Sequence, residues 1–291
     1  MKFILTADWH LRATQPRCRI DKDWMQTQRN ALNQVFEYAS SYHCDILVVG
    51  DIFHSNSDAS FQCIQMVQDL ADKLNNIGKG LFILCGNHDL LYHSSQNIDK
   101  SAIGILIHSN NIYPISYYDS RISAPNFDEP CFDNEYIFRH ILTFPDEKSM
   151  PPNISGTTAD ELLEKYTNAK WIFTGDYHKS FCHKKNGRYV INSGCLICQA
   201  TDFKDYQPGV YYIDTDHDIV NFLPITDNKE YIDDSYILKQ DEREKRLDDF
   251  IKKVDGTKAM SLDFIENIEN ELSSGDYSKE FADEVRKFIG V

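Results

Sequence analysis

Aspartate, asparagine and histidine residues recur in this sequence at or just after short apolar runs. The runs have the length and composition of strands, and a glycine stands beside most of the polar groups. In chain order the groups contain Asp8, His10, Asp51, His54, Asn87, His88, His140, Asp176 and His178. Carboxylate, amide and imidazole donors of this kind suit hard or borderline divalent cations such as Mn²⁺, Mg²⁺, Fe²⁺ or Zn²⁺. A fold that gathers these groups would form a metal site.

The elements that would position these groups alternate between strand and helix in the first third of the chain. We predict strands at residues 3–6, 45–49 and 81–85, with helices at 23–41 and 59–74. This order implies parallel strands in a layered α/β sheet, and sites form at the carboxyl edge of such sheets. Glycines at the strand ends let the backbone turn sharply and a metal ion come close.

The next part of the chain has shorter strands and two hairpins. We predict helices at 102–108 and 159–166, and strands at 112–115, 121–124, 136–144 and 171–174. Asn186-Gly187 is a strong hairpin turn between 181–184 and 188–192, and a second hairpin joins 210–215 to 219–225. These elements suggest a second sheet packed on the first, with helices outside.

The order of the polar groups is more specific than any one group, because a single D-x-H occurs by chance and a lone Gly-Asp is usually a turn. The order resembles the calcineurin-like metallophosphoesterase pattern D-x-H, G-D-x-x-[DH], G-N-H-[DE], H and G-H-x-H over about residues 1–226. The resemblance implies an α/β fold, a four-layer αββα sandwich, and metal-assisted hydrolysis of phosphate esters.

The same resemblance implies a role for each matched residue. One metal ion would be held by Asp8, His10 and His178, and Asp51 would bridge to a second ion held by Asn87, His140 and Asp176. Two such ions share an activated water and stabilise charge on the attacking and leaving oxygens. His88 would protonate the leaving oxygen or stabilise the phosphate, and His54 would orient His88. The Asn192-Ser193-Gly194 turn would support the site.

Asp176 departs from the family pattern, which has histidine there. A carboxylate can still bind a metal ion, and its harder oxygen favours Mn²⁺ or Mg²⁺ over Zn²⁺, so Mn²⁺ is the expected ion. Alternatively Asp176 is a turn residue and the second metal site is weak or empty. A further alternative is a fold kept only as a binding module.

Four motifs narrow the resemblance to the SbcD and Mre-type recombination and repair nucleases: T-A-D-W-H-L at 6–11, G-D-I-F-H at 50–54, G-N-H-D at 86–89 and G-D-Y-H-K at 175–179. The departure at Asp176 resembles the bacteriophage versions of the subunit. This resemblance implies a DNA exonuclease subunit that works beside an SMC-like ATPase of the SbcC type and forms homodimers, in a bacterial or phage-infected cell. The alternative is a stand-alone phosphodiesterase or phosphatase that acts on nucleotides or phosphoproteins.

The formal net charge of −15 limits how the chain could bind DNA. Neutralisation of phosphates by basic side chains normally supplies most of the affinity for nucleic acid. Here that contribution must come from bound metal ions, a local basic patch or a partner.

We expect a nuclease domain at 1–226 and an acidic helical tail at 227–291, where 18 acidic and 11 basic residues give a net charge of −7. Three amphipathic helices are predicted there, with apolar faces at Leu247, Phe250, Ile251 and Val254, at Phe264, Ile265, Ile268 and Leu272, and at Phe281, Val285, Phe288 and Ile289. Ser261 and Ser278 would cap the last two. The tail would bind the ATPase, cap the DNA, or simply cover the core.

The eight cysteines show little regular spacing. Cys195 and Cys198 form a C-x-x-C that could join Cys182 and His183 in a zinc site, but we expect reduced, mostly buried thiols. No apolar run approaches the roughly 20 residues of a membrane span, and Asp8 comes too early for a signal peptide. We therefore expect a soluble cytoplasmic protein without a membrane segment.

Overall fold

Nearly continuous apolar runs form the strands of a six-stranded sheet, because such strands are buried on both faces. The computed structural model describes residues 1–56, 58–109, 111–203, 205–226, 231–233, 235, 246, 264–275 and 277–289. They fall into two compact units, Met1–Asp233 and Asp234–Val291. The six-stranded sheet of the first unit has the order β13-β12-β1-β2-β3-β4. Its parallel strands are β1 (Lys2–Thr6), β2 (Asp45–Val49), β3 (Leu81–Leu84) and β4 (Ile112–Pro114).

The second sheet has five strands in the order β10-β11-β9-β6-β5. They are β10 (Phe181–Lys185), β11 (Arg188–Asn192), β9 (Trp171–Gly175), β6 (Tyr136–His140) and β5 (Ile122–Ser123). All are parallel except β10, which forms the hairpin with β11 that Asn186-Gly187 predicted. Asn186 and Gly187 both have positive φ angles, 52° and 76°, as a tight hairpin turn requires.

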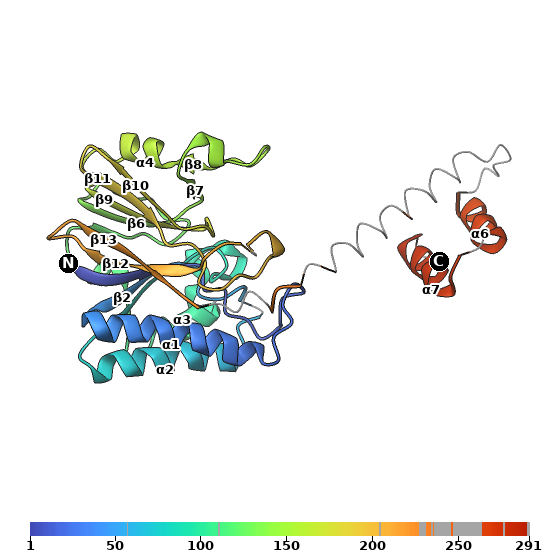
Figure 1. Cartoon of the computed structure of the whole chain (residues 1–291), viewed down its shortest axis with the longest axis horizontal. Helices are drawn as coiled ribbons and strands as arrows, with labels where there is room; N and C mark the ends of the chain where they lie inside the picture. Colours follow the sequence, from blue (N-terminus) through green and yellow to red (C-terminus); the bar gives the residue numbers. More distant parts are fainter. Residues whose placement is uncertain are drawn as a thin grey trace. The chain divides into compact units, whose positions relative to one another are not determined.

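Helices cover the outer faces of both sheets (Figure 1). The helices α1 (Trp24–Tyr42), α2 (Phe61–Asn76) and α3 (Ala102–Ile107) pack on the first sheet, and α4 (Ala159–Lys165) packs on the second. The N-caps of α1 and α2 are Asp23 and Ser60, whose side chains accept hydrogen bonds from the first-turn amides of Gln26 and Cys63. The predicted four-layer αββα sandwich is confirmed.

An aromatic core lies between the two sheets. The ring of Phe173 lies 5.4 Å from that of Phe3 and 4.6 Å from that of Phe138, so the opposing strands interlock through these side chains. Burial of each such side chain stabilises the fold by roughly 1.5–3 kcal/mol. The sandwich therefore holds the carboxyl ends of β1 and β9 in a fixed relation.

Two features of the sheets differ from the sequence prediction. The strand predicted at 136–144 ends at His140, because its neighbour β9 ends at Gly175, the partner of His140. The next residues form the short strand β7 (Thr143–Phe144), which pairs with β8 (Thr157–Thr158). The late hairpin of β12 (Gly209–Asp214) and β13 (Ile219–Pro224) joins the first sheet, antiparallel to β1, instead of the second.

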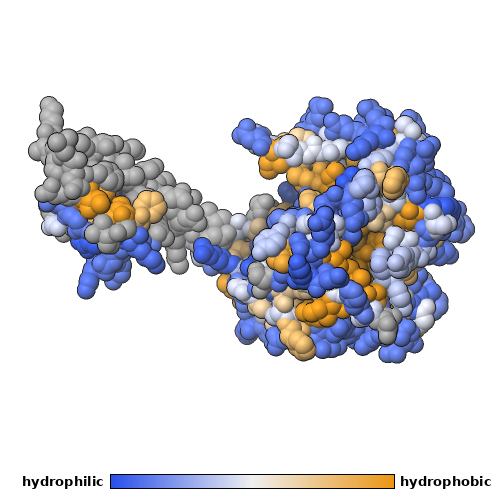
Figure 2. Space-filling view, turned by 180° about the vertical axis from the view of Figure 1, so that it is seen from behind, coloured by the Kyte–Doolittle hydropathy of each residue, from blue (hydrophilic) through white to orange (hydrophobic). Residues whose placement is uncertain are grey.

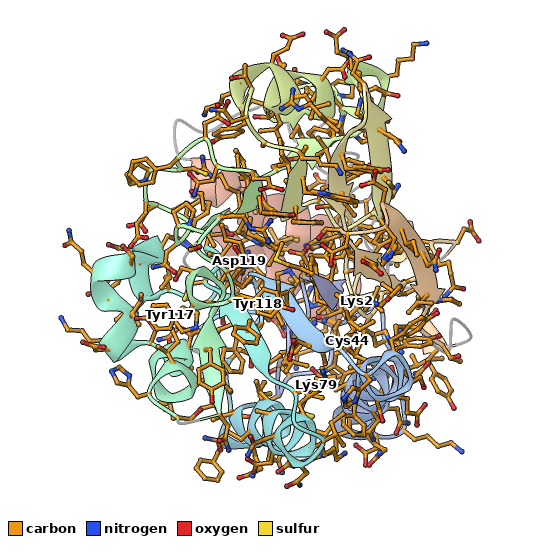
Figure 3. All side chains as sticks on the ribbon, turned by 90° about the vertical axis from the view of Figure 1, so that its left-hand side faces the viewer. Lys2, Cys44, Lys79, Tyr117, Tyr118 and Asp119 are labelled. Atoms are coloured by element: carbon orange, nitrogen blue, oxygen red, sulfur yellow. The ribbon has the colours of Figure 1, made fainter. Side chains whose placement is uncertain are left out.

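Tyr118 lies at the end of the first sheet where the parallel strands begin, near Lys2 and Cys44 (Figure 3). The Tyr118 hydroxyl lies 3.2 Å from the Lys2 carbonyl oxygen and 3.1 Å from Asp45 Oδ2. Burial, and then the Asp45 carboxylate, raise the pKa of Tyr118 well above its ordinary value. The polar groups at this end thus satisfy one another.

The second unit contains two packed helices, α6 (Phe264–Ser274) and α7 (Lys279–Ile289). Their common core consists of Ile268, Leu272, Ala282 and Val285. The Ser278 hydroxyl accepts a hydrogen bond from the Phe281 amide at 3.3 Å, as predicted for an N-cap. Phe288 is 84% exposed, so it does not belong to the buried face where we placed it. The helix predicted around 247–254 and the Ser261 cap lie outside the described residues.

Hydrophilic residues cover most of the face of the first unit seen in Figure 2, with apolar patches between them. Six cysteines are buried, Cys131 is partly buried and Cys182 is exposed, all as free thiols. Within the described ranges, no group of potential metal ligands includes a cysteine, which argues against the zinc alternative. Within the same ranges, no helix is long and apolar enough to cross a bilayer.

Candidate metal centre

The carboxyl ends of β1, β2, β3, β6 and β9 meet at one edge of the sandwich, and the polar groups that follow them converge there. Two sets of side chains, each with ligand atoms within 4.8 Å of one another, could hold a metal ion: Asp8, His10 and His178, and Asp8, Asp51 and His140. A third set, His10, His54 and His88, lies beside them. Asn87 follows β3 next to His88, and Asp176 follows β9 with its side chain 30% exposed.

Asp51 occupies the middle of the cluster. Its Oδ2 atom lies 3.2 Å from His140 Nε2 and 3.6 Å from His10 Nε2, while Oδ1 accepts a hydrogen bond from the His88 amide at 3.0 Å. On the far side, the Nε2 atoms of His10 and His178 are 3.0 Å apart. One carboxylate oxygen thus faces imidazoles from both sides, which is the position of a bridging ligand.

The His140 ring is oriented by the main chain. Its Nδ1 atom donates to the Val49 carbonyl oxygen at 2.8 Å, which turns Nε2 toward Asp51. Burial would lower the pKa of His140, but the Asp51 carboxylate, with Asp8 and Asp176, outweighs it and raises this pKa to about 10. His10 Nδ1 and Asn87 Oδ1 are buried without a hydrogen-bond partner, and His140 Nε2 faces the Asp51 carboxylate at 3.2 Å. A buried polar atom without a partner costs roughly 1–3 kcal/mol, and a cation would offset this cost at Asn87. The donor set therefore fits divalent metal ions.

Burial also prepares the ligands electrostatically. It lowers the pKa of both His10 and His178, which keeps these rings neutral and their lone pairs available. Burial, reinforced by the carboxylates of Asp51 and Asp176, raises the pKa of Asp8 even though His140 opposes the shift. Burial would likewise raise the pKa of Asp51, but His140 and other histidines outweigh it and lower this pKa. Three crowded carboxylates of this kind call for positive charge between them.

The backbone of the cluster is strained. Asp8, His10, Asp51 and Asp176 have φ angles of 51°, 45°, 53° and 83°, in the left-handed region that costs a non-glycine residue about 1–3 kcal/mol. Hydrogen bonds from the Asp8 amide to the Gly50 carbonyl at 3.1 Å and from the His10 amide to the Asp51 carbonyl at 3.0 Å hold this conformation. The surrounding fold therefore imposes the ligand geometry.

Two glycines make room for the ligands. A Cβ atom on Gly50 would overlap the His140 ring, and one on Gly86 would overlap the Asp51 carboxylate. Gly50 also has a φ of 86°, which side-chain-bearing residues rarely adopt. The G-D and G-N-H motifs thus need glycine for space.

Sequence reasoning missed the part played by Asp89, although the residue belongs to the G-N-H-D motif. Its carboxylate is fully buried and accepts hydrogen bonds from the Phe53 amide at 2.9 Å and the Gly86 amide at 3.0 Å. Burial and the Asp51 charge raise its pKa to about 7. Asp89 therefore fastens the loop after β2 to the loop after β3.

Asn192 supports the loop that carries Asp176 and His178. Its amide nitrogen donates to the carbonyl oxygens of Tyr177 and, at 3.0 Å, Lys179, and its Oδ1 accepts from the Thr174 hydroxyl at 3.2 Å. This contact agrees with a supporting function for the Asn192-Ser193-Gly194 turn.

His54 contacts His88 through its main chain. His88 Nδ1 donates to the His54 carbonyl oxygen at 2.5 Å, whereas the two rings only stack, 5.8 Å apart. Protonated His88 would therefore carry its transferable proton on Nε2. Burial and the neighbouring Arg12 cation lower the pKa of His54.

A pocket of about 220 Å³ opens beside these histidines. Its lining is His10, Arg12, His54, His88, His178, Cys195, Ile197, Gln199, Ala200 and Phe203, with no carboxylate among them. Trp9 does not reach it, because its side chain is fully buried and donates to the Thr6 hydroxyl at 2.8 Å. Trp9 is a core residue, so its presence gives no direct information about substrate.

The sequence of residues 1–194 matches the family model described as calcineurin-like phosphoesterase. The chain belongs to the calcineurin-like phosphoesterases. The predicted family is thereby confirmed. Membership indicates a hydrolytic phosphoesterase that uses divalent metal ions, in agreement with the donor sets described above.

Two curated relatives of this phosphoesterase are components of nucleases. "Probable exonuclease subunit 1" of Escherichia phage T5 is 22% identical over 237 residues, 70% of each protein. The SbcD component of the SbcCD nuclease of Staphylococcus saprophyticus is 27% identical over 150 residues, 48% of this chain and 39% of the relative. Among solved structures, an archaeal phosphodiesterase aligns with 77% of this chain and 100% of its own, at 15% identity and a TM-score of 0.40.

Proposed function

We propose that this phosphoesterase is a DNA nuclease that depends on two metal ions and serves as the exonuclease subunit of an SbcCD-like complex. The observation that carries the proposal is the position of Asp51 Oδ2, which faces His140 Nε2 at 3.2 Å and His10 Nε2 at 3.6 Å. Similarity to two nuclease components favours DNA as the substrate.

The ligands divide into two sets around Asp51. Asp8, His10 and His178 would hold the first ion, and Asn87, His140 and Asp176 would complete the second. Asp176 Oδ1 lies 3.9 Å from His140 Nε2, at the open side of the second set. When bound, two divalent cations supply an activated water and stabilise charge on the phosphate oxygens. The carboxylate at Asp176 favours Mn²⁺ among the candidate ions.

His88 is placed to assist departure of the leaving oxygen. Its Nδ1 is committed to the His54 carbonyl, and its ring lines the pocket 5.1 Å from the ring of His10. A histidine in this position can donate the Nε2 proton to the leaving oxygen.

The charge of the pocket lining bears on how an acidic chain could accept an anionic substrate. Although the chain has a net charge of −15, the pocket lining contains Arg12 and four histidines and no acidic residue. An anionic phosphodiester could approach here without direct repulsion. The proposed partner, an SbcC-type ATPase, would supply further DNA affinity, and the unit with α6 and α7 would be its binding segment or a cap over the DNA. A homodimer belongs to the same proposal.

A single set of assays tests this function. Wild-type protein and His88→Ala are incubated with Mn²⁺ and linear double- or single-stranded DNA, bis-p-nitrophenyl phosphate or p-nitrophenyl phosphate. We expect the wild type to degrade DNA and the variant to lose at least a hundredfold in rate. Hydrolysis of small esters alone would instead support a phosphodiesterase or phosphatase of nucleotides or phosphoproteins. No hydrolysis of any ester would support a binding module.

A further inference from the structure

The pocket extends beyond the residues assigned to the metal ions. Besides His10, His88 and His178, the lining includes residues of the segment 195–203, and Ile197 and Phe203 are its large apolar side chains. A phosphate group and two metal ions would use only the histidines. The remaining space, within a pocket of about 220 Å³, has an apolar wall that phosphate chemistry does not explain.

The Phe203 ring is partly exposed and has other rings beside it. It lies 5.8 Å from the His178 ring and 5.9 Å from the Tyr206 ring. The Phe203 carbonyl accepts from the Tyr206 amide at 2.9 Å, and the Tyr206 hydroxyl accepts from the Ser180 amide at 3.0 Å. The Lys179 ammonium lies 5.7 Å from the centre of the Phe203 ring. An aromatic ring next to a candidate metal ligand can serve as a stacking surface.

Arg12 provides a cation in the same pocket. Its main chain is fixed by hydrogen bonds with Gln28, at 2.9 and 3.0 Å, and with the Trp24 indole at 3.1 Å. Arg12 Nε lies 3.2 Å from Asp58 Oδ2, and the side chain still lines the pocket beside His54. Guanidinium groups bind phosphate oxygens well, because their planar array of donors matches the oxyanion.

We propose that this pocket is a subsite for one nucleotide next to the scissile phosphate, in which the base stacks on Phe203 and the neighbouring phosphate pairs with Arg12. The inference rests on the proposed nuclease function and adds to it the recognition of a nucleotide unit. Stacking on an aromatic ring tolerates any base, since every base has a π face. The subsite would therefore select nucleotides over other phosphoesters without selecting sequence.

A substrate–enzyme double cycle tests the stacking contact. Two hexathymidylate substrates carry an abasic residue at the 5′ or the 3′ end, and kcat/KM is measured with Mn²⁺ for wild type and Phe203→Leu. We expect loss of one terminal base to reduce the wild-type value about tenfold, Phe203→Leu to cause a similar loss on the intact substrate, and the combination to add little more. Phe203→Trp, which keeps an aromatic face, should retain the penalty for the missing base.

Phe132→Leu is the matched control, because Phe132 is 70% exposed and does not line the pocket. It should show the same abasic penalty as wild type. An undiminished penalty in Phe203→Leu would overturn the stacking proposal while leaving the nuclease proposal intact. Hydrolysis of bis-p-nitrophenyl phosphate without any cleavage of the oligonucleotides would overturn both.

The proposed contact between Arg12 and the neighbouring phosphate is tested by combining an enzyme variant with a modified substrate. An uncharged methylphosphonate replaces the linkage that adjoins the scissile one on each side in turn. We expect Arg12→Gln to reduce kcat/KM about fivefold on the charged substrate and much less on the methylphosphonate that removes its partner. Equal losses on all substrates would contradict the assignment of Arg12.

Discussion

The two ends of the first sheet are built from the same parallel strands but are held in different ways. Where the strands begin, the Tyr118 hydroxyl joins the Lys2 carbonyl and the Asp45 carboxylate in a closed set of hydrogen bonds. Where they leave the sheet, Asp8 and Asp51 have left-handed backbone and crowd their carboxylates together. At the first end the polar groups form hydrogen bonds with one another. At the second end they point toward the candidate metal site.

Buried side-chain atoms that lack a hydrogen-bond partner also gather at the end of the sheet where the site lies. Among the described residues, six buried side-chain atoms lack a hydrogen-bond partner: His10 Nδ1, Arg12 Nε, Asn87 Oδ1, His140 Nε2, Gln199 Oε1 and Trp171 Nε1. All except Trp171, at the start of β9, belong to the metal centre or the pocket beside it. Arg12 Nε and His140 Nε2 each face a carboxylate oxygen at 3.2 Å. The atoms that have no partner at all cost stability, and a ligand bound at this end would offset that cost.

The largest expected difference between the ends concerns two aspartates, Asp45 at the start of β2 and Asp51 just after its end. Asp51→Asn should lower kcat for bis-p-nitrophenyl phosphate at least a thousandfold, because a neutral amide cannot bridge two cations. Asp45→Asn is the matched control at the other end: it should leave kcat unchanged and lower the free energy of unfolding by about 1 kcal/mol. Calorimetric titration with Mn²⁺ should detect lost binding only in Asp51→Asn. Equal Mn²⁺ binding by the two variants would contradict the comparison.

The next difference separates the two histidines that meet in the pocket. His88→Ala should reduce kcat a hundredfold or more, whereas His54→Ala should reduce it less than about tenfold. The reason is that the His54 carbonyl, which orients His88, survives truncation of the side chain. Rates on bis-p-nitrophenyl phosphate and melting curves for both variants give the measurement. A loss in His54→Ala as large as in His88→Ala would show that the His54 ring itself takes part.

A smaller effect is expected at Asp176, where a substitution should change the metal preference of the second site. Replacement of its oxygen donor by the nitrogen of histidine should move the preference of the second metal site toward Zn²⁺, by roughly tenfold in the ratio of Zn²⁺ to Mn²⁺ affinity. Competitive metal titration of wild type and Asp176→His measures this ratio. An unaltered ratio would mean that Asp176 is a turn residue outside the coordination sphere.

The sequence was informative where chemistry is tied to local motifs. Strand ends and glycines located Asp8 and Asp51, since short apolar runs and turns are encoded within a few residues, whereas His140 was placed by its position in the family pattern. Pairings between strands that lie far apart in the sequence could not be predicted from such local patterns. The hairpin of β12 and β13 belongs to the first sheet because it pairs with β1, some 200 residues earlier, and no local pattern announces that pairing.

The same distinction applies within the site. The links from Asp89 to the Phe53 amide and from the His54 carbonyl to His88 join separate loops, so residue types alone could not reveal them. Phe203 likewise reaches the pocket from a turn far along the chain. The motif predicts which residues gather at the candidate metal site, while tertiary hydrogen bonds decide how each is held.

The smallest expected effect lies at the closed end and depends on pH. Tyr118→Phe should leave hydrolysis unchanged and cost about 1 kcal/mol near neutral pH. The pKa of Tyr118 is raised in the folded chain, so above about pH 10 the unfolded state releases a proton that the folded state retains, and stability falls as pH rises. The variant should lose this part of the alkaline destabilisation, which urea unfolding at pH 8 and pH 10.5 would measure. If hydrolysis fell together with stability, the two ends of the sheet would be coupled, and the division of stability and function between them would not hold.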